Sequence, residues 1–278
     1  YIVLDLTHIG AETIMKRLPS VYEIGMNFAN VDVTKEPIPV VPTIHYQMGG
    51  IPTNIHGQVV VPKNGNPNTV VEGLYAIGEC SCVSVHGANR LGTNSLLDLL
   101  VFGRAAGNHV VQANLKARDH KPLPVDAGEY TMERIAKLDT SSSGENAQDI
   151  ANDIRKTMQT YAGVFRNQEL LADGVRKMAE LTERAKHVWL KDKSKIFNTA
   201  RIEALEIDNL IQTANSTMIS AAARTESRGA HSHHEYPKRD DANWMKHTLW
   251  YEGNQLEYKP VQLKPLTVDS VPPKERTF

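Results

Sequence analysis

The feature that most constrains the fold is an apolar run that follows Ser95 and is interrupted by Asp98. Its apolar positions are Leu96, Leu97, Leu99, Leu100, Val101 and Phe102. A helix over this run has almost no polar face, and helices of that kind are buried. The sequence therefore predicts a buried helix that starts at Ser95. The small residues between Gly103 and Gly107 would let another element approach it closely.

The loop before this helix places an arginine between glycines, in the order Gly87-Ala88-Asn89-Arg90-Leu91-Gly92-Thr93. A phosphate-binding loop needs a lysine before Thr93, so we exclude a nucleoside triphosphate site. The first amides of a helix carry partial positive charge, which favours a carboxylate, a phosphate or an electron-rich flavin edge. Arg90 adds a planar guanidinium suited to a two-point contact with a carboxylate. The alternative is a structural ion pair between Arg90 and an acid such as Asp98.

Two further polar residues are candidates for the same site. Glu79 ends a segment from Gly73 that we interpret as a buried strand, where an acid can accept hydrogen bonds from ribose or ribityl hydroxyls. The alternative is that Glu79 caps the following loop. His45 lies close to Gly49 and Gly50, and an imidazole can hold a carboxylate or transfer a proton near neutral pH. The Gly-Gly pair predicts close approach of the backbone to a ligand or to another strand.

The second half of the chain has the periodicity of amphipathic helices. After a Ser-rich turn at 141–144, apolar residues recur at helical spacing over 150–161, 170–181 and 199–220. Such helices with short joins predict a small antiparallel bundle. The residues of the last helix that we expect to face inward are Ile202, Leu205, Leu210 and Ile211.

The two ends of the chain are less regular. We expect a short strand over 1–6 and helices near 11–18 and 21–28. From residue 227 the sequence is polar and loop-rich, with a strand-like segment near 256–260. The chain begins within a structural pattern, which we interpret as the inside of a longer polypeptide.

Composition excludes several classes of function. The net charge of -1 gives no support for a nucleic-acid partner, and no apolar run is long enough to span a bilayer. Any membrane contact would therefore come through partners. Cys80 and Cys82 are too close for an ordinary disulfide and too few for a zinc site. Three loop histidines lie close together, at His231, His233 and His234. They have no convincing fourth metal ligand nearby, so we expect no metal and interpret these histidines as solvated.

Taken together, several motifs strongly resemble the flavoprotein subunits of succinate dehydrogenases and fumarate reductases. The motifs are His45–Asn54, Gly78-Glu79, His86–Asp98, Gly163–Arg166, Arg224–His231, Trp244–Leu249 and Val271–Pro273. They are highly specific and extend over the whole chain. One departure is His233, which stands where relatives often have arginine.

The resemblance implies a role for each candidate residue. His45 and Arg90 would bind the dicarboxylate, Glu79 would bind FAD, and Ser95 and Leu96 would contact the flavin. The family's amino-terminal half carries the glycine-rich dinucleotide loop, the histidine covalently linked to FAD and the proton-relay arginine. We therefore expect no catalytic residue in this chain and a relay arginine upstream of it.

The implied reaction oxidises succinate to fumarate, with FAD as the hydride acceptor. Electrons would pass to an iron–sulfur subunit and, through membrane anchor subunits, to quinone. The implied location is peripheral, on the cytoplasmic face of the bacterial inner membrane or the matrix face of the mitochondrial inner membrane. The alternatives are a fumarate reductase, a less favoured L-aspartate oxidase, and a non-catalytic scaffold piece.

The implied fold class is α/β plus α. Segments of a capping domain and of a Rossmann-like FAD-binding domain precede a helical bundle and an irregular tail. The expected boundaries are residues 1–44 for the end of the capping domain, 45–124 for the carboxyl-terminal FAD-binding segment, 125–226 for the helical domain and 227–278 for the last domain.

Overall fold

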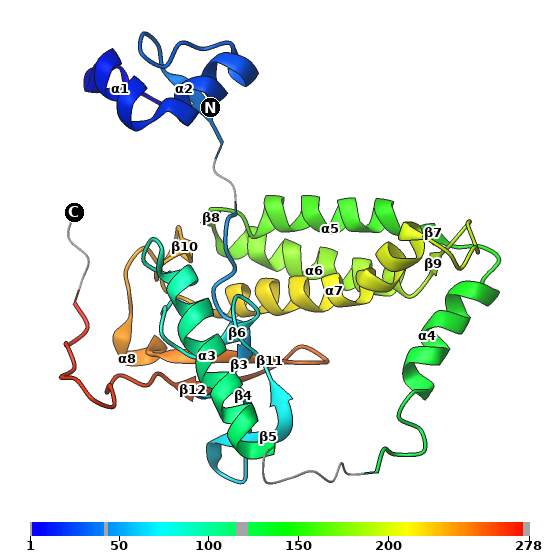
Figure 1. Ribbon diagram of the computed structural model, residues 1–278. Helices are drawn as coiled ribbons and strands as arrows, with labels where there is room; N and C mark the ends of the chain where they lie inside the picture. The colour runs from blue at the N-terminus through cyan, green and yellow to red at the C-terminus, as the bar shows by residue number, and fades with distance from the viewer. Residues whose placement is uncertain (1, 42–43, 115–121, 275–278) are drawn as a thin grey trace. The chain divides into compact units, whose positions relative to one another are not determined.

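The computed structural model describes residues 2–41, 44–114 and 122–274, which fall into two compact units, Tyr1–Gln47 and Met48–Phe278 (Figure 1). The first unit pairs β1 (Ile2–Leu4) antiparallel with β2 (Ile38–Val40). Its core contains the buried side chains of Leu6, Ile14 and Val33. The helical elements between these strands are η1 (Thr7–Ile9), α1 (Ala11–Arg17), α2 (Pro19–Ile24) and the π-helical turn η2 (Gly25–Ala29). The strand and both helices predicted here are confirmed.

The second unit begins with short strands. The strand β3 (Ile51–Pro52) pairs in parallel with β6 (Ser81–Cys82), and β4 (Gln58–Lys63) forms an antiparallel hairpin with β5 (Asn66–Tyr75). The buried strand predicted over 73–79 is therefore wrong. The strand ends at Tyr75, and the side chains of Leu74 and Ile77 are exposed. We had inferred burial on both faces from the apolar run. The segment instead ends an antiparallel hairpin, and one face of a hairpin can stay open to solvent.

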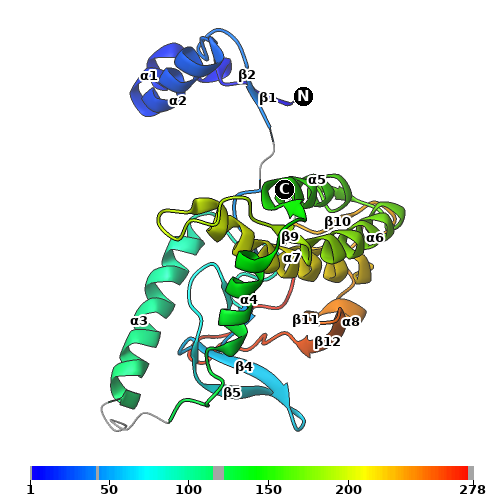
Figure 2. The same ribbon diagram turned by 90° about the vertical axis from the view of Figure 1, so that its right-hand side faces the viewer.

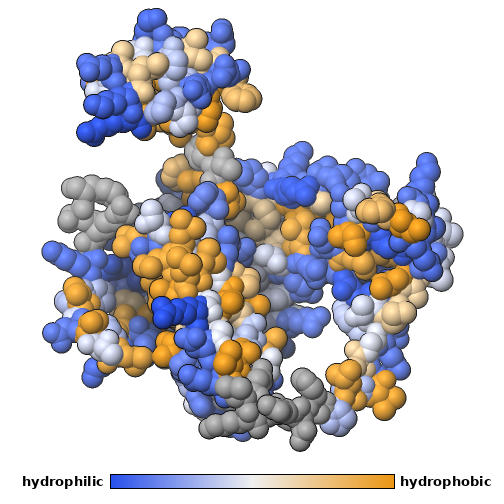
Figure 3. Space-filling model, viewed as in Figure 1, coloured by the Kyte–Doolittle hydropathy of each residue, from blue (hydrophilic) through white to orange (hydrophobic). Residues whose placement is uncertain are grey.

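The apolar run forms the helix α3 (Asn94–Asn114), one residue longer at its start than predicted. Its predicted burial is wrong, because Leu96 is 65% exposed and Leu100 is 73% exposed. Figure 3 shows hydrophobic side chains gathered on the surface over α3. Asp98 and Ala106 are the α3 residues that are buried among the described side chains. The periodicity indicated a helix that prefers an apolar surrounding, but the described residues cover only one narrow stripe of it.

The predicted bundle is confirmed. The helices α5 (Ala147–Tyr161), α6 (Gln168–Ala185) and α7 (Thr199–Ala223) lie side by side in both views (Figures 1 and 2). Each begins where an asparagine side chain accepts a backbone N–H of the first turn, which fixes the start of the helix. These capping residues are Asn146, Asn167 and Asn198. A fourth helix that we had not predicted, α4 (Glu129–Thr140), precedes them and contacts α7.

The bundle core is closely packed. Leu171 and Met218 are fully buried, and a Cβ added at Gly174 would lie 2.6 Å from Met218 Sδ. Of the residues expected to face inward on α7, Ile211 is buried, whereas Ile202 is exposed and that assignment is wrong. The inward stripe of α7 instead follows Ala204, Ile207, Ile211, Ala214 and Met218. The turns between the helices pair in parallel, β7 (Glu145–Asn146) with β9 (Val188–Trp189).

The last part of the chain packs back on the rest of this unit. The strand β10 (Ser232–His233) pairs in parallel with β8 (Phe165–Arg166), which joins α5 to α6. The short helix α8 (Asp241–Trp244) leads into an antiparallel hairpin of β11 (Lys246–Tyr251) and β12 (Gln255–Pro260). The predicted strand near 256–260 is confirmed, and β11 was not predicted. Within the described ranges, no helix has the length and apolarity needed to cross a bilayer.

The structure is thus a mixed α/β protein with a helical bundle. The detailed division of the chain into capping, FAD-binding, helical and carboxyl-terminal domains stays a prediction.

Candidate functional site

Arg90 lies half-buried in the loop between β6 and α3, where its Nη1 atom is 3.4 Å from the carbonyl oxygen of Leu91. Asp98, the acid that we considered as its structural partner, is bonded to His86 instead. The distance between His86 Nε2 and Asp98 Oδ2 is 2.8 Å, and the Asp98 side chain is almost fully buried. This bond ties the loop four residues before Arg90 to the first turns of α3.

The backbone of the loop is held in an uncommon conformation. Ser84 has a φ of +74° and Thr93 a φ of +68°, both in the left-handed region that non-glycine residues rarely occupy. Each such residue costs on the order of 1–3 kcal/mol, so the surrounding structure must hold it in place. At the start of α3 the amide of Leu96 donates to the carbonyl oxygen of Thr93 over 3.1 Å.

Residues far along the chain provide that support. The Oγ atom of Ser84 lies 2.7 Å from Nε2 of His247 on β11. The turn at Gly229 and Ala230 packs on the loop backbone, where the amide of Ala230 donates to the carbonyl oxygen of Ala88 over 3.3 Å. The carboxyl-terminal region therefore braces the loop that carries Arg90.

Glu79 is exposed and follows Gly78, which has a φ of +80°. A Cβ at Gly78 would lie 2.6 Å from Leu99 Cδ2, so the glycine lets α3 approach the end of β5. Gly50 lies against the backbone of Cys80, and the amide of Ile51 donates to the Cys80 carbonyl oxygen over 2.9 Å. The close approach predicted from the Gly-Gly pair is therefore to a neighbouring strand.

Four of the predicted site residues belong to one continuous segment of the chain, between the end of β5 and the first turn of α3. Ser95 and Leu96 occupy the first turn of α3, directly after the Arg90 loop, and Glu79 begins the path into that loop. His45 is exposed and belongs to the first unit, whereas Arg90 belongs to the second.

A charged cluster that we had not predicted supports the base of the Gly229 turn. Glu226 is fully buried and accepts hydrogen bonds from Arg224, from Arg228 and from the amide of Asp240. Burial raises the pKa of Glu226, but the Arg228 side chain and the other donors outweigh it and hold the pKa below its usual value. The alternation of charges in Arg-Thr-Glu-Ser-Arg was the available sequence signal.

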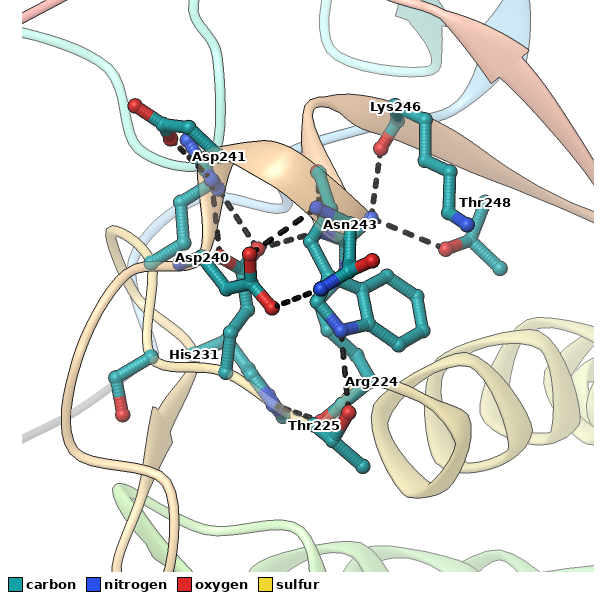
Figure 4. Close-up of polar contacts among 12 residues, drawn as sticks. Arg224, Thr225, His231, Asp240, Asp241, Asn243, Lys246 and Thr248 are labelled. Atoms are coloured by element: carbon teal, nitrogen blue, oxygen red, sulfur yellow. Dashed lines mark hydrogen bonds and ion pairs between the residues drawn. The ribbon is translucent and has the colours of Figure 1, made fainter.

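Arg224 extends this cluster to the last hairpin. Its Nη2 atom donates to the carbonyl oxygen of Lys246 over 2.7 Å and to Oγ1 of Thr248 over 3.2 Å (Figure 4). Its guanidinium also lies 4.8 Å from the centre of the Trp244 ring. The segment from Arg224 to Thr248 is therefore held as one polar network.

Our interpretation of the loop histidines as solvated is wrong for two of them. His231 is buried and His233 is 1% exposed, whereas His234 is exposed. His231 Nδ1 lies 2.8 Å from the Arg166 guanidinium, and Nε2 lies 3.1 Å from the Arg224 carbonyl oxygen, so Nδ1 accepts and Nε2 donates. Burial lowers the pKa of His231 to about 4, which keeps the ring neutral. Over the described residues, no cluster of three potential metal ligands occurs.

Two family models match the chain. One, described as "FAD binding domain", matches residues 1–96, and the other, described as "Fumarate reductase flavoprotein C-term", matches residues 151–278. The first match contains the Arg90 loop and the start of α3. The second contains most of the bundle and the whole region that braces the loop.

Relatives of the chain have consistent names. A succinate dehydrogenase flavoprotein subunit from Coxiella burnetii is 48% identical over 99% of this chain and 47% of the relative. A mitochondrial succinate dehydrogenase flavoprotein subunit from Oryza sativa is 47% identical over 100% of this chain and 45% of the relative. Among solved structures, a quinol fumarate reductase from E. coli superposes with a TM-score of 0.81 at 38% identity, covering 97% of this chain and 45% of that one.

The chain spans about half the length of the relatives that it matches. Over that half, the motifs, the fold and the sequence identity all indicate the same family. The chain belongs to the family of succinate dehydrogenase and fumarate reductase flavoprotein subunits.

Proposed function

We propose that this chain is the carboxyl-terminal part of a succinate dehydrogenase flavoprotein subunit, which oxidises succinate to fumarate with FAD as the hydride acceptor. The observation that carries the proposal is the half-buried Arg90 in a braced loop directly before the first turn of α3. A permanent cation beside a helix amino end suits one carboxylate of a dicarboxylate. His45 is the second proposed contact for the dicarboxylate, on the basis of the family resemblance.

The residues at the start of α3 fit a flavin. A fit requires hydrogen-bond donors beside an open apolar surface, and this turn offers Ser95 next to the exposed side chain of Leu96. The exposed carboxylate of Glu79 can accept hydrogen bonds from sugar hydroxyls. These residues would hold FAD, which accepts a hydride when bound. Arg90 and His45 would orient the dicarboxylate and stabilise negative charge that develops on it.

The proton step belongs to a part of the family's subunit that this chain does not span. We infer that the relay arginine and the site of covalent FAD attachment lie in the remaining half of the relatives' length. The partners that follow from family membership are an iron–sulfur subunit and membrane anchor subunits that lead to quinone. The subunit would then sit peripherally on the cytoplasmic face of a bacterial inner membrane or on the mitochondrial matrix face.

The test is Arg90→Lys in the full-length subunit within its complex. Lysine cannot reproduce a two-point contact with a carboxylate, so kcat/KM for succinate should fall on the order of 100-fold. The matched control is Arg104→Lys, which alters an exposed arginine on α3 and should leave activity unchanged. Near-normal succinate oxidation by Arg90→Lys would show that the site is wrongly placed.

Fumarate reduction is the second candidate, favoured by the structural match to the E. coli quinol fumarate reductase. Both directions use the same carboxylate contacts, so the residues of this chain serve either one. The ratio of the two rates, measured in the purified complex with a quinone and with a quinol, decides between them.

A further inference from the structure

We propose that Gly229 positions Arg90. The turn that contains Gly229 and Ala230 packs on the substrate-binding loop, and through this contact the carboxyl-terminal region sets the affinity for the dicarboxylate. The proposal rests on the assignment of Arg90 as a carboxylate-binding residue. Gly229 contacts neither substrate nor flavin in this scheme. It acts on Arg90 through Ala88, two residues earlier in the loop.

The contact between the turn and the loop leaves no free space. A Cβ built on Gly229 would lie 2.6 Å from the backbone carbon of Ala88, 2.7 Å from its carbonyl oxygen and 2.8 Å from its Cβ. Two of these atoms belong to the main chain, so no side-chain rotation can relieve the overlap. The same Ala88 carbonyl oxygen accepts the amide of Ala230 over 3.3 Å. Any larger residue at 229 must therefore move the backbone of the Arg90 loop or the turn.

The turn itself is held firmly. Arg228 and His231 exchange backbone hydrogen bonds of 2.8 Å and 3.0 Å, which closes a two-residue turn whose first residue, Gly229, has a φ of +58°. The buried Glu226 fixes Arg228 through Nε at 2.7 Å and Nη2 at 2.9 Å. His231 connects to Arg166 in the strand between α5 and α6. Because the turn is anchored on both sides, the loop is the softer partner and takes up most of the displacement.

A second contact with the carboxyl-terminal region supports the same loop, at Ser84. Ser84 Oγ lies 2.7 Å from His247 Nε2, and Ser84 holds a left-handed backbone conformation with a φ of +74°. Burial lowers the pKa of His247, with Lys259 and Arg224 adding to the effect, which favours the neutral ring. The loop is thus supported before and after His86 by residues of the carboxyl-terminal region.

The test compares Gly229→Ala with Gly253→Ala in the full-length subunit within its complex. Both glycines have positive φ, at +58° and +81°, but the space around Gly253 is open. An alanine is strained by the positive φ at either position, but only Gly229→Ala presses on the loop. We expect Gly229→Ala to raise KM for succinate on the order of tenfold, because displaced contacts weaken substrate binding. The dissociation constant of fumarate, measured from the flavin absorbance change, should rise by a similar factor.

Flavin content separates positioning from a general loss of the folded site. Positioning predicts that KM and the fumarate dissociation constant rise in Gly229→Ala while its flavin content stays at the Gly253→Ala value. Equal KM values in the two glycine variants would overturn the inference.

If Gly229→Ala does not fold, Ser84→Ala tests the support of the same loop by the carboxyl-terminal region through the contact with His247. Its matched control is Ser81→Ala, which removes a hydroxyl that donates to the nearby carbonyl oxygen of Gly78. A rise in KM for Ser84→Ala above that of Ser81→Ala supports the bracing of the loop, and equal values contradict it.

The Arg90→Lys variant separates this inference from the proposed function. Loss of succinate oxidation in Arg90→Lys with unchanged KM in Gly229→Ala and Ser84→Ala rejects the bracing and keeps the site. Normal activity in Arg90→Lys rejects the site itself, and the inference fails with it.

Discussion

The bundle and the helix α3 make opposite use of apolar residues. In the bundle, Ile150, Leu171 and Met218 are fully buried by neighbouring helices. On α3, the side chains of Leu96 and Leu100 are largely exposed. The bundle therefore completes its core within this chain, whereas α3 has an apolar surface that the described residues do not cover. The difference teaches that apolar periodicity shows which residues prefer to be buried. It does not show which part of the protein buries them.

The largest effect that tests this comparison is expected in the bundle. Leu171→Ala should lower the free energy of unfolding by about 2–5 kcal/mol, because it leaves a cavity in a closely packed core. Urea unfolding of the chain, followed by circular dichroism, measures the change. A loss below about 1 kcal/mol would show that the bundle can collapse around the missing side chain and that its packing is looser than described.

An intermediate effect on the free energy of unfolding is expected from His231. This residue connects Arg166, between α5 and α6, to the turn that packs on the Arg90 loop. Its pKa is about 4 in the folded protein against 6.5 as the ordinary value, because burial disfavours the charged ring. The unfolded chain therefore binds the proton first, so stability is fully present above pH 6.5 and is lost as the pH falls toward 4. The loss reaches about 3 kcal/mol at most.

The variant His231→Gln removes this titration. The difference in unfolding free energy between wild type and His231→Gln should shrink between pH 6.5 and 4 and stay constant above that range. The exposed His234→Gln serves as the control and should follow the wild-type pH dependence. Parallel curves for wild type and His231→Gln would contradict a neutral, buried His231.

The smallest effect is expected on the exposed face of α3. Leu100→Ala should change the unfolding free energy of this chain by no more than about 0.5 kcal/mol, because its side chain is already in water. The same substitution in the full-length subunit should cost several times more if the rest of that subunit covers α3. Equal effects in the two proteins would mean that the α3 surface stays exposed there too.

Much of the fold was predictable, because helix periodicity and capping are local. The three bundle helices and their asparagine caps follow from residues within a few positions of each other. Ile202 was misassigned because a 25-residue helix allows more than one apolar stripe, and the partner helices select one of them. The candidate residues Glu79 and Arg90 could be proposed from local sequence, Ser95 and Leu96 came from the family resemblance, and all four stay predictions.

The support of the site was not predictable in the same way. His86 with Asp98, Ser84 with His247, and Gly229 with Ala88 are pairs that no spacing rule connects. The buried histidines were misjudged for the same reason. His231 lies in a polar stretch of sequence, and its burial comes from Arg166 and Arg224.

The sequence by itself determined the family and the helical bundle, because residue types and short-range periodicity carry that information, and the chemistry of the Arg90 loop stays a prediction. The tertiary structure alone decided which apolar faces are covered and how the loop is braced. Both depend on contacts between residues far apart in the chain, where the free energy comes from close packing and from satisfying buried polar groups. Neither quantity can be assigned to a residue before its neighbours in space are known.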